Sequence, residues 1–118
     1  MSFNFSNDKP IFLQIEEIIK KQIVSGKILP GEKLKSVREL SAEFQVNPNT
    51  ILNALKNLED SGLVFTDRTN GKFVSDNKKI IDEVKAQQIS STCKTFVSKM
   101  KDFGLNNEQI IKIIKENL

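Results

Sequence analysis

Residues 36–74 read SVRELSAEFQVNPNTILNALKNLEDSGLVFTDRTNGKFV, and this stretch decides the fold. It contains two helix starts close together, and a β-hairpin signal follows the second helix directly. The order helix, sharp turn, helix and hairpin is typical of a winged helix-turn-helix domain. The sequence therefore predicts a fold that is mainly α with a small β-hairpin.

Capping residues mark the start of the first helix in this stretch and of another helix upstream. Ser36 and Glu39 have the spacing of a capping box, in which each side chain bonds a backbone N–H that the first turn leaves unpaired. This predicts a short helix over residues 37–44. Upstream, Pro10 suits a first helical turn and Gly26 suits a helix end. Apolar residues recur between them at helical spacing, at Phe12, Ile15, Ile19 and Ile23.

The second helix of the stretch begins at Asn47 and Pro48, a favoured N-cap followed by a favoured first helical residue. It is expected to run to about residue 61, where Gly62 ends it. Only residues 45–47 separate it from the helix before, which is the spacing of a helix-turn-helix. Its expected buried face consists of Ile51, Ala54, Leu55 and Leu58.

A hairpin is predicted directly after this helix. Residues 63–66 and 72–74 are rich in β-branched and aromatic side chains and read as strands. Between them, Asn70 and Gly71 form a favoured two-residue turn, because both residues tolerate a positive φ. Together with the two helices, this hairpin completes the winged helix-turn-helix pattern, which we assign to residues 1–75.

Residues 76–118 are predicted to form a C-terminal helical hairpin that makes a dimer. Gly104 interrupts a first helix, and Asn106 with Gln109 has the spacing of a capping box for a second. Apolar residues of the first helix alternate in steps of four and three, at Ile89, Cys93, Phe96, Met100 and Phe103. Such a face needs a surface that covers it. The winged domain could supply that surface, but we expect a second copy of the chain, related by two-fold symmetry, to do so. The expected dimer interface consists of Ile89, Phe96, Met100, Phe103, Ile110 and Ile114.

Two other interpretations of the C-terminal region remain open at this stage. Its apolar residues could line a ligand or cofactor pocket instead of an interface. Cys93, the single cysteine, could act as a redox switch or could simply be a small buried apolar residue. No feature of the sequence specifies a small-molecule effector.

Composition bounds the possible functions. The 118 residues, 38% hydrophobic and 28% charged, suit one domain with a small appendage. There is no apolar run long enough for a membrane span and no signal-peptide core, so a cytoplasmic protein without a membrane partner is expected. The absence of histidine excludes Ser-His-Asp and Cys-His catalysis and imidazole metal sites. We therefore expect no enzyme, no metal site and no cofactor.

Net charge is only weak support for a nucleic-acid partner. The formal charge is +3, and residues 1–75 contain ten basic against nine acidic side chains. Residues 76–118 contain eight against six. The expectation of DNA binding therefore rests on the motif pattern rather than on bulk charge.

Seven short motifs between residues 10 and 74, just over half of the chain, resemble those of the GntR superfamily of bacterial regulators. They are PIFLQI (10–15), SGKILPGEKL (25–34), SVREL (36–40), VNPNT (46–50), ALKNLE (54–59), SGLV (61–64) and GKFV (71–74). The NPNT element and the short helical tail are most similar to the YtrA-like subfamily. The sequence departs from the family pattern at Lys35, where proline is common, and at Asn70 and Lys72 in the wing.

The helix-turn-helix geometry itself indicates a first set of DNA-binding residues. The second helix lies in the major groove with its first turns against base edges. Its outward positions are Asn47, Asn49, Thr50 and Asn53. Asparagine suits adenine because it donates and accepts together, and threonine suits a phosphate or a thymine methyl group. Asn47 is at the same time expected to cap its helix.

The resemblance and the wing add further candidates. Arg38 matches a family position that contacts DNA, with an ion pair to Glu39 or Glu43 as the alternative. Ser36 is a candidate phosphate ligand, with capping alone as the alternative. In the wing, the candidates for the minor groove are Arg68, Asn70, Gly71 and Lys72. Lys72 could equally be a solvated strand residue, and Lys33 and Lys35 are either phosphate-attracting or plain surface lysines.

The resemblance implies a transcriptional repressor that binds double-stranded DNA as a homodimer on an inverted-repeat operator, with a transporter operon as a candidate target. A competing hypothesis is an interaction module that uses the winged fold to bind a protein, and specific DNA binding separates the two. An enzyme has no support, because Asp82, Glu83 and Asp102 are isolated carboxylates on helical faces.

Overall fold

The structure is a computed structural model that describes residues 3–118. Its elements in chain order are α1 (Ile11–Val24), α2 (Val37–Phe44), α3 (Pro48–Asp60), β1 (Val64–Asp67), β2 (Gly71–Val74), α4 (Lys78–Asp102) and α5 (Asn107–Glu116). The two strands form one antiparallel sheet. The prediction of a mainly α fold with a small β-hairpin is therefore confirmed.

The chain forms two compact units that divide inside α4, the first ending at Asp82 and the second beginning at Glu83. The sequence placed the functional boundary earlier, after residue 75. The first turn of α4 belongs to the first unit, where Ile81 is buried. Asn77 caps this turn, since its side-chain oxygen accepts a hydrogen bond from the Lys79 N–H at 3.1 Å.

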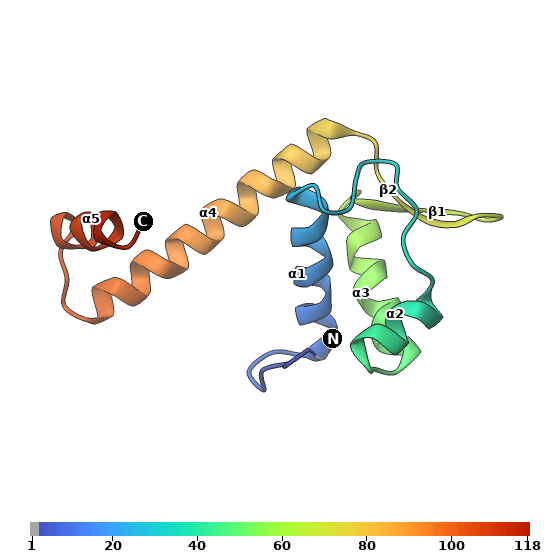
Figure 1. The fold of residues 1–118 in the computed structure, drawn as a ribbon, viewed down its shortest axis with the longest axis horizontal. Helices are drawn as coiled ribbons and strands as arrows, with labels where there is room; N and C mark the ends of the chain where they lie inside the picture. The colour runs from blue at the N-terminus through green and yellow to red at the C-terminus, as the bar shows by residue number, and fades with distance from the viewer. Residues whose placement is uncertain (1–2) are drawn as a thin grey trace. The chain divides into compact units, whose positions relative to one another are not determined.

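The central element of the first unit is α3, which contacts α1, α2 and β1 (Figure 1). Its apolar stripe is completely buried and consists of Ile51, Ala54, Leu55 and Leu58. The neighbouring helices bury matching side chains, namely Ile15, Ile19 and Ile23 of α1 and Leu40 and Phe44 of α2. Burial of one such large side chain stabilises a fold by about 1.5–3 kcal/mol, so this cluster fixes the helices against one another.

A sharp turn joins α2 to α3. Only Gln45, Val46 and Asn47 lie between the helices, as the sequence predicted. Gln45 has φ +56° and is the only non-glycine residue within residues 3–118 with a positive φ. The Val46 N–H then donates a hydrogen bond to the Ser41 carbonyl at 3.1 Å, which closes the end of α2. The left-handed conformation of Gln45 thus sets the direction in which α3 begins.

The segment before α1 covers the end of α2, an arrangement that the sequence analysis did not anticipate. The Phe3 and Phe5 rings lie 4.4 Å and 6.4 Å from the Phe44 ring, measured between centroids. The Gln14 side chain holds the segment in place, because its amide accepts from the Ser6 N–H and donates to the Ser6 carbonyl, both at 2.9 Å. The turn region therefore receives support from an aromatic cluster.

The wing is wider than a simple hairpin because the loop after α1 joins it. The strands pair from Val64 with Val74 to Asp67 with Gly71. Beside β2, the Leu34 N–H donates to the Lys72 carbonyl at 2.8 Å and the Val74 N–H donates to the Glu32 carbonyl at 2.9 Å. These bonds pair backbone groups along the outer edge of β2 and attach the wing to the rest of the first unit.

The wing turn differs from the two-residue turn expected at Asn70 and Gly71. Asp67 pairs with Gly71, so residues 68–70 form a three-residue loop, and only Gly71 has a positive φ, at +103°. The Asp67 carboxylate accepts hydrogen bonds from the Thr69 N–H at 2.9 Å and from the Asn70 side-chain amide at 3.3 Å. These bonds stabilise the longer loop. The hairpin is confirmed, and the predicted turn type was wrong.

The second unit consists of most of α4, a turn at Gly104, and α5. Gly104 has φ +83°, which ends α4 and redirects the chain. The predicted capping box is present at the start of α5, where the Asn106 and Gln109 side chains each accept from the other residue's backbone N–H at 2.9 Å. Within residues 3–118, no helix has both the length and the apolar character needed to cross a membrane.

We expect Gln45→Gly to raise the free energy of unfolding by about 1 kcal/mol. A left-handed conformation costs a residue with a Cβ about 1–2 kcal/mol, and glycine avoids this cost while losing up to about 1 kcal/mol of chain entropy. Urea denaturation measures the change. Gln45→Ala, which keeps a Cβ, serves as the control with little gain, and equal stability of the two variants would contradict a strained turn.

Candidate nucleic-acid interface

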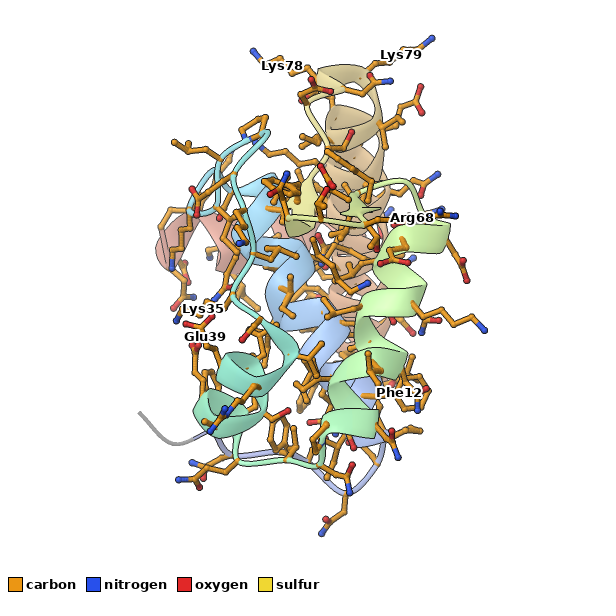
Figure 2. The ribbon with its side chains drawn as sticks, turned by 90° about the vertical axis from the view of Figure 1, so that its right-hand side faces the viewer. Phe12, Lys35, Glu39, Arg68, Lys78 and Lys79 are labelled. Carbon is orange, nitrogen blue, oxygen red and sulfur yellow. The ribbon has the colours of Figure 1, made fainter. Side chains whose placement is uncertain are left out.

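The start of α2 is fixed by the capping box that the sequence predicted. The Ser36 hydroxyl accepts a hydrogen bond from the Glu39 N–H at 3.1 Å, and the Glu39 carboxylate accepts from the Ser36 N–H at 2.9 Å. The hydrogen bonds from Ser36 lower the pKa of Glu39. Figure 2 shows Glu39 and Lys35 near one another at this end of the helix. Ser36 is exposed, and its hydroxyl proton remains free to bond a phosphate.

The guanidinium group of Arg38, on α2, has no ion-pair partner among the described residues. It is exposed, and within the described residues it forms no ion pair with either of the carboxylates considered from the sequence. Glu43 is instead paired with Lys35 at 2.7 Å, and Glu39 is engaged in the capping box. The planar head of Arg38 can therefore bind an anion without first breaking an intramolecular contact.

The first turns of α3 expose polar side chains on the face opposite its buried stripe. The Asn47 side-chain oxygen accepts a hydrogen bond from the Asn49 N–H at 2.8 Å, which confirms the capping prediction. Asn49 and Asn53 are exposed, and Thr50 is half-buried. In this turn Asn47 retains a free amide group that can still donate.

Two further residues on this face were missed by the sequence analysis. Leu52 is 45% exposed, and Lys56 is also exposed. Both lie one helical turn from the exposed asparagines, Leu52 three residues after Asn49 and Lys56 three after Asn53. The sequence could have indicated both, because both lie outside the expected buried stripe of the helix. A leucine exposed on an otherwise polar face is a candidate for apolar contact with a base methyl group.

The tip of the wing presents Arg68, Asn70 and Gly71 to solvent. Arg68 lies in the hairpin loop (Figure 2) and forms no ion pair in the part of the chain that the structure covers. The loop is held by the Asp67 carboxylate, whose pKa is lowered by hydrogen bonds from Thr69 and Asn70. A Cβ added to Gly71 would lie 3.3 Å from Lys33 Cε, so glycine lets this lysine lie against the wing.

Lys72 is held differently from the other wing candidates. Its ammonium group forms an ion pair with the Glu59 carboxylate at the end of α3 and donates a hydrogen bond to the Thr66 hydroxyl at 2.9 Å. The Thr66 hydroxyl in turn donates to Glu59 at 2.6 Å. Glu59 was not singled out in the sequence, because it lies far from Lys72 in the chain and only the fold brings them together.

The candidate residues form two clusters at opposite ends of α3. Asn47 and Asn49 begin the helix, whereas Glu59, at its end, binds Lys72 of the wing. A helix of this length spans roughly 20 Å. The first unit therefore presents polar groups along one helix and a separate, arginine-bearing loop beyond its end. Within residues 3–118 there is no group of three or more carboxylate or thiol side chains arranged to hold a metal ion.

The residues proposed for a dimer interface differ in how far they are exposed to solvent. Ile89, Phe96 and Phe103 of α4 are 60%, 41% and 80% exposed. Cys93, between them in the pattern, is exposed as well. Met100 and Ile114 are half-buried. Ile110 is only 4% exposed and is thus already covered within the single chain.

Comparison with known proteins identifies similar sequences and structures. The pattern of "Bacterial regulatory proteins, gntR family" matches residues 12–74, more than half of the chain. The HTH-type transcriptional repressor YtrA of Bacillus subtilis is 36% identical over 108 residues, which cover 91% of this chain and 83% of that protein.

Solved structures are similar over most of the chain or over about two thirds of it. A GntR family transcriptional regulator from Listeria monocytogenes has 37% identity and a TM-score of 0.88, with 95% of this chain and 98% of that chain covered. AraR(DBD) in complex with operator ORX1 has 30% identity and a TM-score of 0.58, with 64% of this chain and 95% of that chain covered.

The contact between Glu59 and Lys72 predicts a measurable titration. Hydrogen bonds from Lys72 and Thr66 hold the pKa of Glu59 below its usual range. A carboxyl group whose pKa is lower in the folded state stabilises the fold above its unfolded pKa, and this contribution is lost as the pH falls through the folded pKa. We expect Lys72→Met to raise the pKa of Glu59, measured by NMR of the side-chain carboxyl carbon. Asp67 is the internal control, and an unchanged Glu59 titration would refute the ion pair.

Proposed function

Since the chain belongs to the GntR family of bacterial regulatory proteins and is YtrA-like, we propose that it is a sequence-specific repressor of transcription that binds an inverted-repeat operator as a homodimer. The observation that carries the proposal is the exposed polar face of α3, whose asparagines are not used in the core. The similar AraR(DBD) structure contains operator DNA, which supports the same type of partner for this chain.

In this proposal α3 lies in the major groove with its first turns against base edges. Asn49 and Asn53 are suited to adenine, because an amide can accept from N6 and donate to N7. Asn47 and Thr50 flank them at the start of the helix, and Leu52 supplies an apolar surface for a thymine methyl group. Direct recognition by α3 then relies on hydrogen bonds from asparagine, since this helix contains no arginine.

Contacts to the DNA backbone and the minor groove come from the other elements. Ser36, which caps α2, and Arg38 on α2 are candidates to bind phosphates, with Arg38 also able to bind guanine. The wing loop carries Arg68, Asn70 and Gly71 to the adjacent minor groove, where the negative potential favours arginine. Lys72 belongs to the same region, although its ammonium group is bound to Glu59 in the free protein.

The C-terminal helical region is proposed to form the dimer, so that residues 1–75 bind DNA and residues 76–118 hold two copies together. Three large apolar side chains of α4, Ile89, Phe96 and Phe103, are exposed in one chain. Their burial against a second copy would contribute about 25 cal/mol for each Å² removed from water. A two-fold dimer also matches the symmetry of an inverted-repeat operator. Because its partner is chromosomal DNA, the proposed place of action is the bacterial cytoplasm, and a transporter operon is the candidate target.

The DNA-binding proposal is tested with Arg38→Ala. Selection from a random duplex library first identifies the preferred site, which is expected to have two-fold symmetry. Titration of that site at two salt concentrations should then show that Arg38→Ala weakens binding by about 1–3 kcal/mol and, for a phosphate contact, lowers the salt slope by about 0.9 per contact. Lys112→Ala, which removes an exposed charge from α5, is the matched control. Selection without any enriched sequence would instead favour a protein-binding module.

Dimerisation is tested with Phe96→Asp. A charge in the proposed interface is expected to produce a monomer in sedimentation equilibrium and to weaken operator binding at least tenfold, since each half-site would then bind alone. Thr95→Asp places the same charge on a neighbouring exposed position of α4 outside the apolar face and should leave the dimer intact. Circular dichroism verifies that both variants remain helical. A Phe96→Asp dimer as stable as the wild type would refute the interface.

A further inference from the structure

The Lys72 ammonium group is bound to other side chains of the protein. It bonds to the Glu59 carboxylate and to the Thr66 hydroxyl, and its side chain is only 23% exposed. Thr66 lies directly across the hairpin from Lys72 and also donates to Glu59, so the three side chains form a closed network. The Lys72 carbonyl accepts from the Leu34 N–H at 2.8 Å, which fixes the backbone at the same position.

The position of Glu59 explains why this network is favourable. Glu59 and Asp60 both lie in the last turn of α3, and no basic residue lies in that turn. The carboxyl end of a helix carries a partial negative charge, so two carboxylates there are unfavourable without a nearby cation. Lys72 supplies that cation from the wing. The lowered pKa of Glu59 agrees with this arrangement.

We propose that Glu59 is a positioning residue of the DNA interface, which holds Lys72 against α3 and thereby keeps its ammonium group from binding DNA phosphate. The proposal rests on the DNA-binding function argued above. A lysine adds to sequence-independent affinity only if it neutralises a phosphate and releases a counterion. Lys72 would first have to leave Glu59, so the exchange gives no net gain in ion pairs. Glu59 thus limits the electrostatic part of DNA binding and leaves the wing contact to Arg68.

The contrast with Arg68 supports this division. Both residues belong to the hairpin and both are cationic, yet Arg68 is exposed and unpaired within the described chain, whereas Lys72 is bonded on two sides. An intramolecular carboxylate therefore distinguishes two wing cations that the sequence presents as equivalent. The neighbouring Asp60 is exposed and bonds neither of them.

The test measures binding of the full-length protein to a duplex without the selected site, over a range of salt concentrations. Glu59→Gln keeps an acceptor for Thr66 but removes the charge that holds Lys72. We expect its plot of log K against log salt to be steeper than the wild-type plot by about 0.9. This corresponds to a relative gain of about eightfold as the salt falls from about 1 M to about 0.1 M. Lys72→Met alone should leave the wild-type slope unchanged, because Lys72 contributes no phosphate contact there.

Two controls separate this effect from a general change in charge. Asp60→Asn removes one negative charge from the same turn without releasing Lys72 and should show no steeper slope. The double variant Glu59→Gln, Lys72→Met should return to the wild-type slope. An equal gain in Asp60→Asn, a gain that persists in the double variant, an unchanged Glu59→Gln slope, or a reduced slope for Lys72→Met would each overturn the role of Glu59 while leaving DNA binding in place. A wild-type protein that binds no duplex would overturn the proposed function, and this inference with it.

Discussion

The structure depends on one constraint, namely that α3 buries one face completely and leaves polar side chains exposed on the other. The helix α3 contacts α1, α2 and the hairpin strand β1, and its four apolar residues at helical spacing, Ile51, Ala54, Leu55 and Leu58, are fully buried in a single stripe. Because one face of α3 packs against all three neighbours, the opposite face is not needed for the core. The side chains on that face are therefore available to contact a partner. They are asparagines, a leucine and a lysine. Loss of the stripe would therefore remove the interface together with the core.

The wing is attached to the rest of the first unit on two sides. The loop after α1 contributes to this, since its backbone bonds to Lys72 and Val74 along the outer edge of β2. Glu59 contributes from the other side, through the side chains of Lys72 and Thr66. The wing is thus attached both through backbone bonds, which need only a backbone N–H and a carbonyl group, and through an ion pair, which depends on particular side chains.

Much of this arrangement could be predicted from local sequence patterns. The capping boxes at Ser36 and Asn106, and the Asn47 cap, mark helix starts through contacts within four residues, so their signal is present in the sequence itself. The wing turn was predicted less well, because the Asp67 side chain stabilises a three-residue loop that the Asn-Gly pair alone does not indicate.

Contacts between distant segments could not be predicted from the sequence at all. Phe3 and Phe5 meet Phe44 only after α1 and α2 have packed, and Glu59 meets Lys72 only when the hairpin folds back on α3. The candidate DNA-binding residues were accessible to sequence reasoning because they lie at the starts of two capped helices and in one hairpin. The role of Glu59, which binds Lys72, could not be predicted, because no periodic pattern in the sequence connects Glu59 to the wing.

Both arginines of the chain stand outside the ion pairs of the described residues. Each of the four ion pairs found in residues 3–118 has a lysine as its cation. The sequence contains only two arginines, Arg38 and Arg68, and neither of them is paired within that range. Both are exposed, one on α2 and one at the tip of the wing. A lysine ammonium is a compact and flexible point charge that suits a local ion pair, whereas the guanidinium offers a planar fork for phosphate or a base edge. Ion pairs within residues 3–118 therefore engage four lysines and leave both arginines unpaired, and arginine is the cation better suited to nucleic acid.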